Sequence, residues 1–118
     1  AIVKTLMFVH GEDDVPVIAL VAGDRQCDAA ALAISVGSTA PCRRPDAARV
    51  KAATGYAIGG VSPIGLPDGL PVFIDSSLFR FAAVWSAAGH PHCVFQATPR
   101  QLQALCGGTV SEAIAAGG

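Results

Sequence analysis

The sequence has little charge and no long apolar run. Only 14% of its 118 residues are charged and the net charge is −1, which argues against capture of nucleic acid by a strongly basic surface. Although 52% of the residues are hydrophobic, no window approaches the roughly 18 uninterrupted apolar residues of a membrane span. The N-terminal residues also lack the basic and apolar regions of a secretion signal. We therefore expect a soluble, cytoplasmic protein that binds no membrane.

Paired cysteines are absent as well. The four cysteines are scattered with no CxxC pair, and in so apolar a sequence they fit small buried hydrophobes of a reducing compartment better than disulfides or zinc ligands. A metal site is an alternative at His90, His92 and Cys93, which lie close together in sequence but lack a fourth ligand at a suggestive spacing. The same segment also fits a turn between two strands. The sequence thus predicts no cofactor and no metal.

The common nucleotide-binding and hydrolase motifs are missing too. A glycine-rich stretch at 54–65 lacks the Lys-Ser/Thr of a P-loop and the GxGxxG spacing, and no G-x-S-x-G nucleophile elbow is present. Its aliphatic residues and Tyr56 indicate a shaped, partly buried loop rather than a flexible linker. Gly59 and Gly60 expose consecutive N–H groups that suit a carbonyl oxygen or a phosphate. The alternative is a tight structural connection before the next strand.

The residues that are present fit one α/β domain, because 118 residues are enough for a single core. β-forming and apolar runs predict a hairpin of strands at 2–9 and 15–22, the second of them buried on both faces. A helix at 27–36 is expected to be well buried. A second helix follows at 45–53, where Asp46 complements the N-terminus.

The second half of the sequence mixes short strands and helices. The pattern predicts further strands at 72–75, 83–87 and 93–97. Helical turns are expected at 76–81 and 110–116. The clearest helix begins with Thr98 as N-cap, Pro99 at the first helical position and Gln101 in a capping-box pattern. Because strands and helices do not alternate strictly and hairpins recur, we expect a curved, mixed or antiparallel sheet or barrel with helices packed outside it.

Several of these segments together resemble a known family. They are Lys4-Thr5-Leu6, Thr54-Gly55-Tyr56, Gly59-Gly60-Val61-Ser62-Pro63-Ile64-Gly65, Ile74-Asp75 and Thr98-Pro99-Arg100-Gln101-Leu102. This combination is similar to the YbaK-like family of aminoacyl-tRNA deacylases, which includes free-standing editing proteins and the editing domain of bacterial prolyl-tRNA synthetases. The resemblance runs from residue 3 to about residue 114, so residues 1–118 are expected to form one such domain. Family members carry a further segment before the first strand, and we expect part of the pocket to lie in such a segment.

The resemblance implies the fold of the prolyl-tRNA synthetase editing domain and a specific reaction. Such a protein hydrolyses the ester between a wrongly attached amino acid and the 3′-terminal adenosine of tRNA, with neither a metal nor a protein nucleophile. The amides of Gly59 and Gly60 would hold the substrate carbonyl and stabilise the oxyanion. Lys4 would engage the terminal phosphate or ribose, and water or a group of the substrate would attack. Mischarged tRNA is then the partner, with an aminoacyl-tRNA synthetase as an optional second one.

Four further residues are candidates for substrate binding: Tyr56, Ser62, Pro63 and Asp75. Tyr56 would line the pocket or stack on the adenine, although we favour packing in the core. Asp75 would orient the loop or bind the substrate's amino group, or would cap the helical turn that follows it. Ser62 would orient the loop through its hydroxyl or simply start a turn before Pro63.

Two rival functions stay open. A non-catalytic module that binds tRNA or a synthetase would keep the same fold. Four basic residues just before the glycine-rich loop would serve it, or would form a solvated helix face: Arg43, Arg44, Arg49 and Lys51. A hydrolase of small molecules would instead need an acid–base pair, for which Asp75 and the His90/His92 turn are the candidates. The position of Lys4 relative to the glycine-rich loop separates these possibilities.

Overall fold

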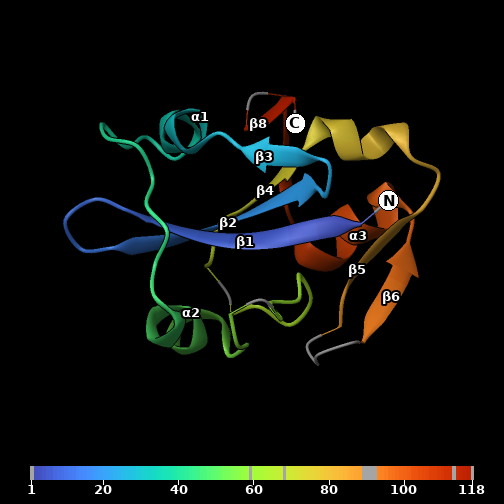
Figure 1. Ribbon diagram of the computed structural model, residues 1–118, viewed down its shortest axis with the longest axis horizontal. Coiled ribbons are helices and arrows are strands. Elements are labelled where there is room, and N and C mark those ends of the chain that lie inside the picture. The colour runs from blue at the N-terminus through green and yellow to red at the C-terminus, as the bar shows by residue number, and fades with distance from the viewer. Residues whose placement is uncertain (1, 59, 68, 89–92, 113, 118) are drawn as a thin grey trace.

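The computed structural model describes residues 2–58, 60–67, 69–88, 93–112 and 114–117, which form helices and short strands around a four-stranded sheet (Figure 1). The order of strands in the sheet is β1 (Val3–His10), β2 (Val15–Ala22), β4 (Val72–Asp75) and β7 (Thr109–Ser111). β1 and β2 are antiparallel, whereas β4 is parallel to β2 and β7 is parallel to β4. The predicted mixed sheet is confirmed, in an open form that leaves β1 at an edge.

The β1–β2 hairpin forms as the sequence predicts. Val3 lies opposite Ala22, and the pairing continues without a break to the turn. That turn contains Gly11 with a φ of 74°, a conformation that glycine adopts without strain. The last six residues of β2 are buried, because both faces of the sheet are covered, as the unbroken apolar run of this strand indicates.

Alternating side chains of the hairpin enter two hydrophobic cores, one on each face of the sheet. The first core joins Val3, Met7, Ile18 and Leu20 to α2 (Ala47–Thr54) and α3 (Pro99–Cys106). The second joins Phe8, Val17, Ala19 and Val21 to α1 (Ala29–Ser35). Figure 1 accordingly shows α1 and α2 on opposite sides of the hairpin. Each fully buried aliphatic side chain contributes about 1.5–3 kcal/mol to this packing.

Side-chain caps begin the three α-helices. Asp28 accepts hydrogen bonds from two backbone N–H groups of α1, both at 3.1 Å. Asp46 accepts from the Arg49 N–H at 2.8 Å and so caps α2, as predicted. At α3 the predicted capping box is confirmed, since Thr98 Oγ1 accepts from the Gln101 N–H at 3.1 Å and Gln101 Oε1 accepts from the Thr98 N–H at 2.9 Å.

The helix α1 is less buried than expected. Only Leu32 and Ala33 are buried in it, and Ile34 is 78% exposed. Its alanine-rich sequence offers an apolar surface on every side, but the helix packs on the sheet along one side only. The prediction of a well-buried helix was therefore wrong, because apolar composition without a stripe does not fix how much of a helix is covered.

The C-terminal segment also departs from prediction. Instead of a helical turn at 110–116, it forms β7 and then β8 (Ala115–Gly117), which pairs with β3 (Arg25–Cys27). Each of these strands has only three residues. Their backbone pairing depends on partners far away in sequence, as Val110 opposite Ile74 shows. Tertiary pairing here overrides local composition.

A second hairpin flanks the sheet. β5 (Val84–Ala87) and β6 (Val94–Ala97) pair antiparallel, as predicted, and follow a 3₁₀ helix, η1 (Ser76–Arg80). The turn between them, with its two histidines, lies outside the described residues. Within the described ranges, no helix has the length and hydropathy needed to cross a bilayer.

Candidate active site

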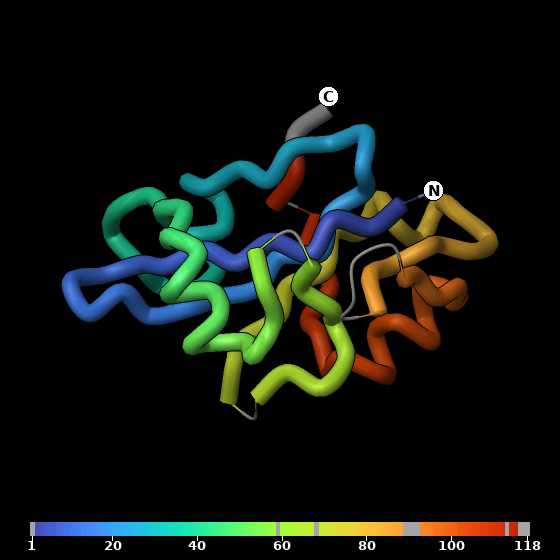
Figure 2. The backbone as a smooth tube through the Cα atoms, turned by 60° about the horizontal axis from the view of Figure 1, so that its bottom comes forward, coloured from blue at the N-terminus to red at the C-terminus, as the bar shows by residue number. Residues whose placement is uncertain are grey.

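A cavity of about 550 Å³ lies along the free edge of β1. Its first wall is the consecutive segment 2–7, so that the edge of the strand itself borders the cavity. Ile58 and Val61 of the glycine-rich loop form a second wall. Figure 2 traces the backbone of this loop, in light green, beside β1, in blue. The β5–β6 hairpin forms a third, held beside β1 by a parallel bridge between Ile2 and Trp85. Segments far apart in sequence thus meet around one space.

The backbone of β1 supplies polar groups to this space. Ile2 lies on the β2 side, where its carbonyl accepts from the Gly23 N–H at 2.7 Å. Val9, by contrast, exchanges two 2.8 Å hydrogen bonds with Arg43 on the opposite side of the strand. Backbone groups alternate between the two sides of an antiparallel strand. The N–H and C=O of Thr5 therefore face away from β2, toward the cavity.

Lys4 belongs to the wall of the cavity, and its ammonium is partly engaged. The residue also lines a neighbouring depression with Gly23, Asp24 and Phe81. Its Nζ donates a hydrogen bond to the carbonyl of Arg25. This contact uses one of the three ammonium donors. Within the described part of the chain, the other two have no recorded acceptor and can bind a ligand.

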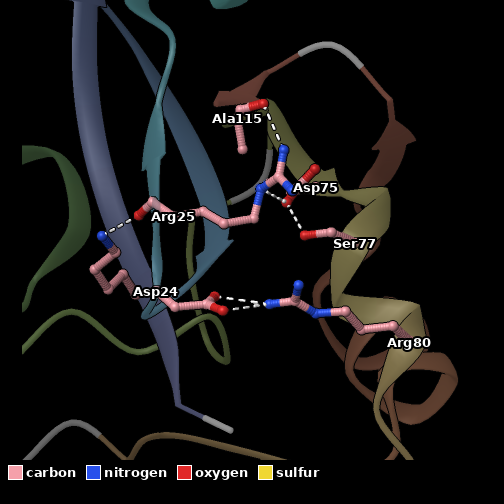
Figure 3. Close-up of polar contacts among 7 residues, drawn as sticks. Asp24, Arg25, Asp75, Ser77, Arg80 and Ala115 are labelled. Carbon is pink, nitrogen blue, oxygen red and sulfur yellow. Dashed lines mark hydrogen bonds and ion pairs between the residues drawn. The ribbon is translucent and has the colours of Figure 1, made fainter. Parts of the chain in front are cut away.

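The side chain of Arg25 is held in turn by a buried network (Figure 3). Its Nε lies 3.4 Å from Oδ2 of Asp75, and its Nη2 donates to the Ala115 carbonyl at 2.9 Å. Ser77 donates its hydroxyl hydrogen to the same carboxylate oxygen. Asp75 is 1% exposed, whereas the Arg25 side chain keeps 26% exposure. The network fixes the strand whose carbonyl receives the Lys4 ammonium.

The contacts of Asp75 contradict the predicted helix cap. It occupies the N-cap position of η1, but its side chain makes no capping hydrogen bond there. It is also not among the described residues that line the cavity. The carboxylate is already paired with Arg25 and Ser77, so the expected contact with a substrate amino group finds no support in this geometry.

The glycine-rich loop is shaped by internal hydrogen bonds. The Tyr56 hydroxyl donates to the Ile64 carbonyl at 2.6 Å, and the ring packs against the first core. The Ser62 hydroxyl accepts from the Ile64 N–H at 3.2 Å. Gly55 ends α2 with a φ of 80°. Tyr56 thus packs and ties the loop together, and Ser62 orients the loop through its hydroxyl.

The predicted oxyanion donors are only partly placed. The Gly60 N–H donates to the Ala57 carbonyl at 2.9 Å, so in this conformation it is occupied within the turn. Gly59 lies outside the described residues. Val61 lines the cavity, and its amide has no recorded partner in the described ranges. Pro63 is buried and borders a different depression, next to the end of α3.

The basic cluster divides into structural and cavity-facing residues. Arg43 pairs with Asp14, and Arg49 donates to the Asp14 carbonyl at 2.9 Å. Lys51 donates to the carbonyl that follows α2, also at 2.9 Å. Arg44 differs, because its guanidinium lies over the Phe8 ring, 5.1 Å from the centroid, and lines the cavity. Of the four, Arg44 alone joins Lys4 at the site.

Sequence reasoning missed two hydroxyls of the cavity lining. Thr5 Oγ1 and Ser86 Oγ are buried and have no hydrogen-bond partner in the described chain. An unpaired buried hydroxyl costs roughly 1–3 kcal/mol, a cost that the fold bears at two residues of the cavity wall. Alternation along β5 could have indicated that Ser86 is buried, because Val84 and Ser86 are buried and Trp85 between them is exposed.

The cysteines show no sign of activation. Burial, with a smaller contribution from Cys42, raises the pKa of the Cys27 thiol from 9.0 to about 11. Burial also raises the pKa of Cys42 and of Cys106. None of these thiols lines the cavity in the described structure, and a raised pKa makes each a poor nucleophile.

The described residues contain no group of three or more His, Cys, Asp or Glu side chains arranged to hold a metal. His90 and His92, the two histidines of the alternative metal site, lie outside those residues. The expectation of a site without metal accordingly stays a prediction.

Comparison with known proteins agrees with this architecture. The chain is 36% identical over 101 residues to the "Uncharacterized protein YwhH" of Bacillus subtilis (strain 168), covering 86% of this chain and 62% of the relative. It is 29% identical over 114 residues to the "Putative Cys-tRNA(Pro)/Cys-tRNA(Cys) deacylase EbsC" of Enterococcus faecalis (strain ATCC 700802 / V583), covering 94% and 66%. The chain thus spans just under two thirds of the length of these relatives.

A solved structure and a family model also match the chain. A crystal structure described as "a putative trans-editing enzyme for prolyl tRNA synthetase" superposes with a TM-score of 0.84 at 39% identity, covering 96% of this chain and 69% of the other. Residues 1–105 match the family described as the aminoacyl-tRNA editing domain. Since this match takes in the edge strand, the glycine-rich loop and the β5–β6 hairpin that together enclose the cavity, the chain belongs to the aminoacyl-tRNA editing domain family.

Proposed function

We propose that the chain is a trans-editing hydrolase that removes the amino acid from mischarged tRNA, with the ester bound in the cavity beside β1. The observation that carries this proposal is the charge of the lining. Lys4 and Arg44 are the charged residues among the described residues around the cavity, and no carboxylate lies with them. Two cations over otherwise mostly apolar walls suit a ligand with phosphate groups at one end and an uncharged acyl group at the other.

The two cations have different tasks in this proposal. Lys4 offers a compact ammonium that engages the terminal phosphate or the ribose, while its bond to Arg25 limits its motion. Arg44 offers a planar fork that binds phosphate oxygens in a bidentate manner and is already oriented by Phe8. Together they would fix the 3′ end of the tRNA so that its ester reaches the glycine-rich loop.

Backbone amides would then stabilise the transition state. We place the substrate carbonyl against the loop at 59–61, where the Val61 amide has no recorded partner in the described structure. The Gly60 amide would join only if the turn released its bond to Ala57. One well-placed donor to the oxyanion lowers the barrier by about 3 kcal/mol.

The nucleophile is water or a group of the substrate itself. Thr5 and Ser86 are among the residues that line the cavity, but their hydroxyl oxygens are buried, and the described lining holds no histidine or carboxylate to act as their base. Water would add to the ester carbonyl carbon, the bond to the 3′ oxygen of the adenosine would break, and that oxygen would take up the proton. The products are the free amino acid and deacylated tRNA, and no metal is needed.

One observation favours a second candidate, a non-catalytic module that binds tRNA or a synthetase. Both predicted catalytic groups that the structure describes are engaged, Lys4 with the Arg25 carbonyl and the Gly60 amide with the Ala57 carbonyl. A module of this kind would bind the 3′ end through Lys4 and Arg44 and would leave the ester intact.

A deacylation assay on a panel of mischarged tRNAs separates the two candidates. The enzyme hypothesis predicts hydrolysis that persists with a chelator and falls about 10²–10³-fold in Gly59→Val, because a bulkier side chain is expected to fill the space of the ester and displace the amides. Cys93→Ala and His92→Ala are the matched controls and should stay active. Binding of the tRNA without hydrolysis of any member would favour the module. Inhibition by the chelator, with Gly59→Val still active, would contradict the mechanism.

A further inference from the structure

Trp85 is the one tryptophan of the chain and is 42% exposed at the cavity. Its neighbours in β5, Val84 and Ser86, are buried, so alternation along the strand turns the indole outward. A large aromatic side chain is more often covered by its own protein. The exposed indole is therefore a candidate surface for binding a ligand in the cavity.

The backbone holds Trp85 in a fixed place. β5 pairs with β6, where Trp85 lies opposite Gln96, and the parallel bridge to Ile2 ties the other side of the strand to β1. Pairing on both sides fixes the backbone that carries the indole, which lowers the entropy cost of binding. Tyr56, the other candidate for stacking, is unsuitable because its hydroxyl is bound to Ile64 and its ring packs on the core.

Other exposed apolar residues gather with Trp85. Ile2 is 65% exposed, Ile58 48% and Val94 57%, and all three line the same cavity. Lys4 and Arg44 border this space too. The surface therefore combines an aromatic face and apolar edges with positive charge, which is the combination that binds single-stranded nucleic acid without reading its sequence.

We propose that the Trp85 indole is the stacking platform for the unpaired base at the 3′ end of an RNA, an adenine in tRNA. This proposal rests on the proposed function, and it names a contact for the base that the reaction itself does not require. Stacking would set the base against β5 while Arg44 and Lys4 hold the phosphates. The smallest ligand of the site is a nucleotide, because both a flat base and a phosphate are recognised.

Because Trp85 is the sole tryptophan, the fluorescence of the 118-residue chain reports on this site directly. Titration with AMP should quench it in a saturable manner, while ribose 5-phosphate, which lacks the base, should quench it weakly. Equal responses to the two ligands, or no response to AMP, would overturn the proposal. A response to neither ligand, together with fluorescence that changes with protein concentration, would show that a second copy covers the indole instead.

Variants test the same contact without the native fluorescence. Binding of a short single-stranded RNA ending in CCA, followed by anisotropy of a 5′ label, should weaken about 5- to 100-fold in Trp85→Leu. Trp85→Phe should stay within a few-fold of the parent, because a smaller ring still stacks. Leu105→Ala removes a side chain that is 54% exposed and away from this cavity, and it should bind normally. Equal affinity of Trp85→Leu and the parent would contradict the proposal.

The two proposals fail in different ways. If Trp85→Leu binds RNA weakly but the parent hydrolyses no mischarged tRNA, the stacking proposal is supported and the proposed deacylase activity is refuted. If the parent is an active deacylase and Trp85→Leu keeps the same KM and kcat, the proposed deacylase activity is supported and the stacking proposal is refuted. A rise in KM with little change in kcat is the expected result, since stacking anchors the base in the ground state and the transition state alike.

Discussion

Replacing Asp75 with asparagine should destabilise the chain strongly, because it breaks a buried ion pair and changes almost no volume. Asp75 is 1% exposed, and its Oδ2 lies 3.4 Å from Nε of Arg25. At that separation the attraction is about 5 kcal/mol for an effective dielectric constant of 20, before the cost of desolvation is subtracted. Asparagine can still accept the hydrogen bond of Ser77, so mainly the charge is lost.

The expected loss is about 2–3 kcal/mol in the free energy of unfolding. Breaking a fully buried pair costs about 3–5 kcal/mol, but the Arg25 side chain keeps 26% exposure and water reduces the penalty of leaving it unpaired. For a chain of 118 residues this corresponds to a fall in Tm of roughly 8–12 °C. Urea unfolding and a thermal melt of the same variant measure both quantities.

The matched control is Asp24→Asn. Asp24 pairs with Arg80 at 2.7 Å, a shorter distance, but the two side chains are 65% and 42% exposed. Exposed pairs contribute about 0–1 kcal/mol, so this variant should melt within a few degrees of the parent. If the two variants lost equal stability, or if Asp75→Asn were neutral, the network behind Lys4 would not be a stabilising one and the reasoning would fail.

Three smaller effects follow from other contacts. Thr98→Ala removes the reciprocal capping of α3 and should lower the free energy of unfolding by about 1 kcal/mol in urea titration. Tyr56→Phe loses the 2.6 Å bond to Ile64 and should cost about 1 kcal/mol, with RNA binding by the CCA assay unchanged. Raising the pH from 9 toward 11 should destabilise the chain, because burial lifts the pKa of Cys27 from 9.0 to about 11 and the unfolded thiol loses its proton first. Cys27→Ala should reduce that loss, and an unaltered pH profile would contradict the assigned pKa.

Local sequence determined the elements whose partners are near in the chain. The β1–β2 hairpin and the Thr98 capping box could be predicted because each depends on a few consecutive residues. β3 and β8 could not, since Arg25 opposite Gly117 brings together segments from the two ends of the chain. The exposure of Ile34 likewise depends on what lies beside α1, which composition does not reveal.

The same distinction holds for the site. The family resemblance predicted site residues on the β1 edge and in the glycine-rich loop. Lys4 and Val61 border one cavity, and their roles stay predictions. It did not show that the Asp75 carboxylate would form an ion pair with Arg25, a residue that no motif includes. Arg44 was predicted only as one of four residues of a basic patch, and Trp85 was missed, because sequence spacing does not reveal the cavity that the two residues share.

The most direct test of the account compares Lys4→Ala with Lys51→Ala on one mischarged tRNA under single-turnover conditions. These are the two lysines of the chain, and Lys51 bonds only to the loop carbonyl of Gly55 among the described contacts. The account predicts that Lys4→Ala slows deacylation by at least about tenfold while the circular dichroism spectrum is retained. Lys4→Arg should recover part of the rate, and Lys51→Ala should stay near the parent. A folded Lys4→Ala protein that deacylates within about twofold of the parent would contradict the claim that this cavity is the active site.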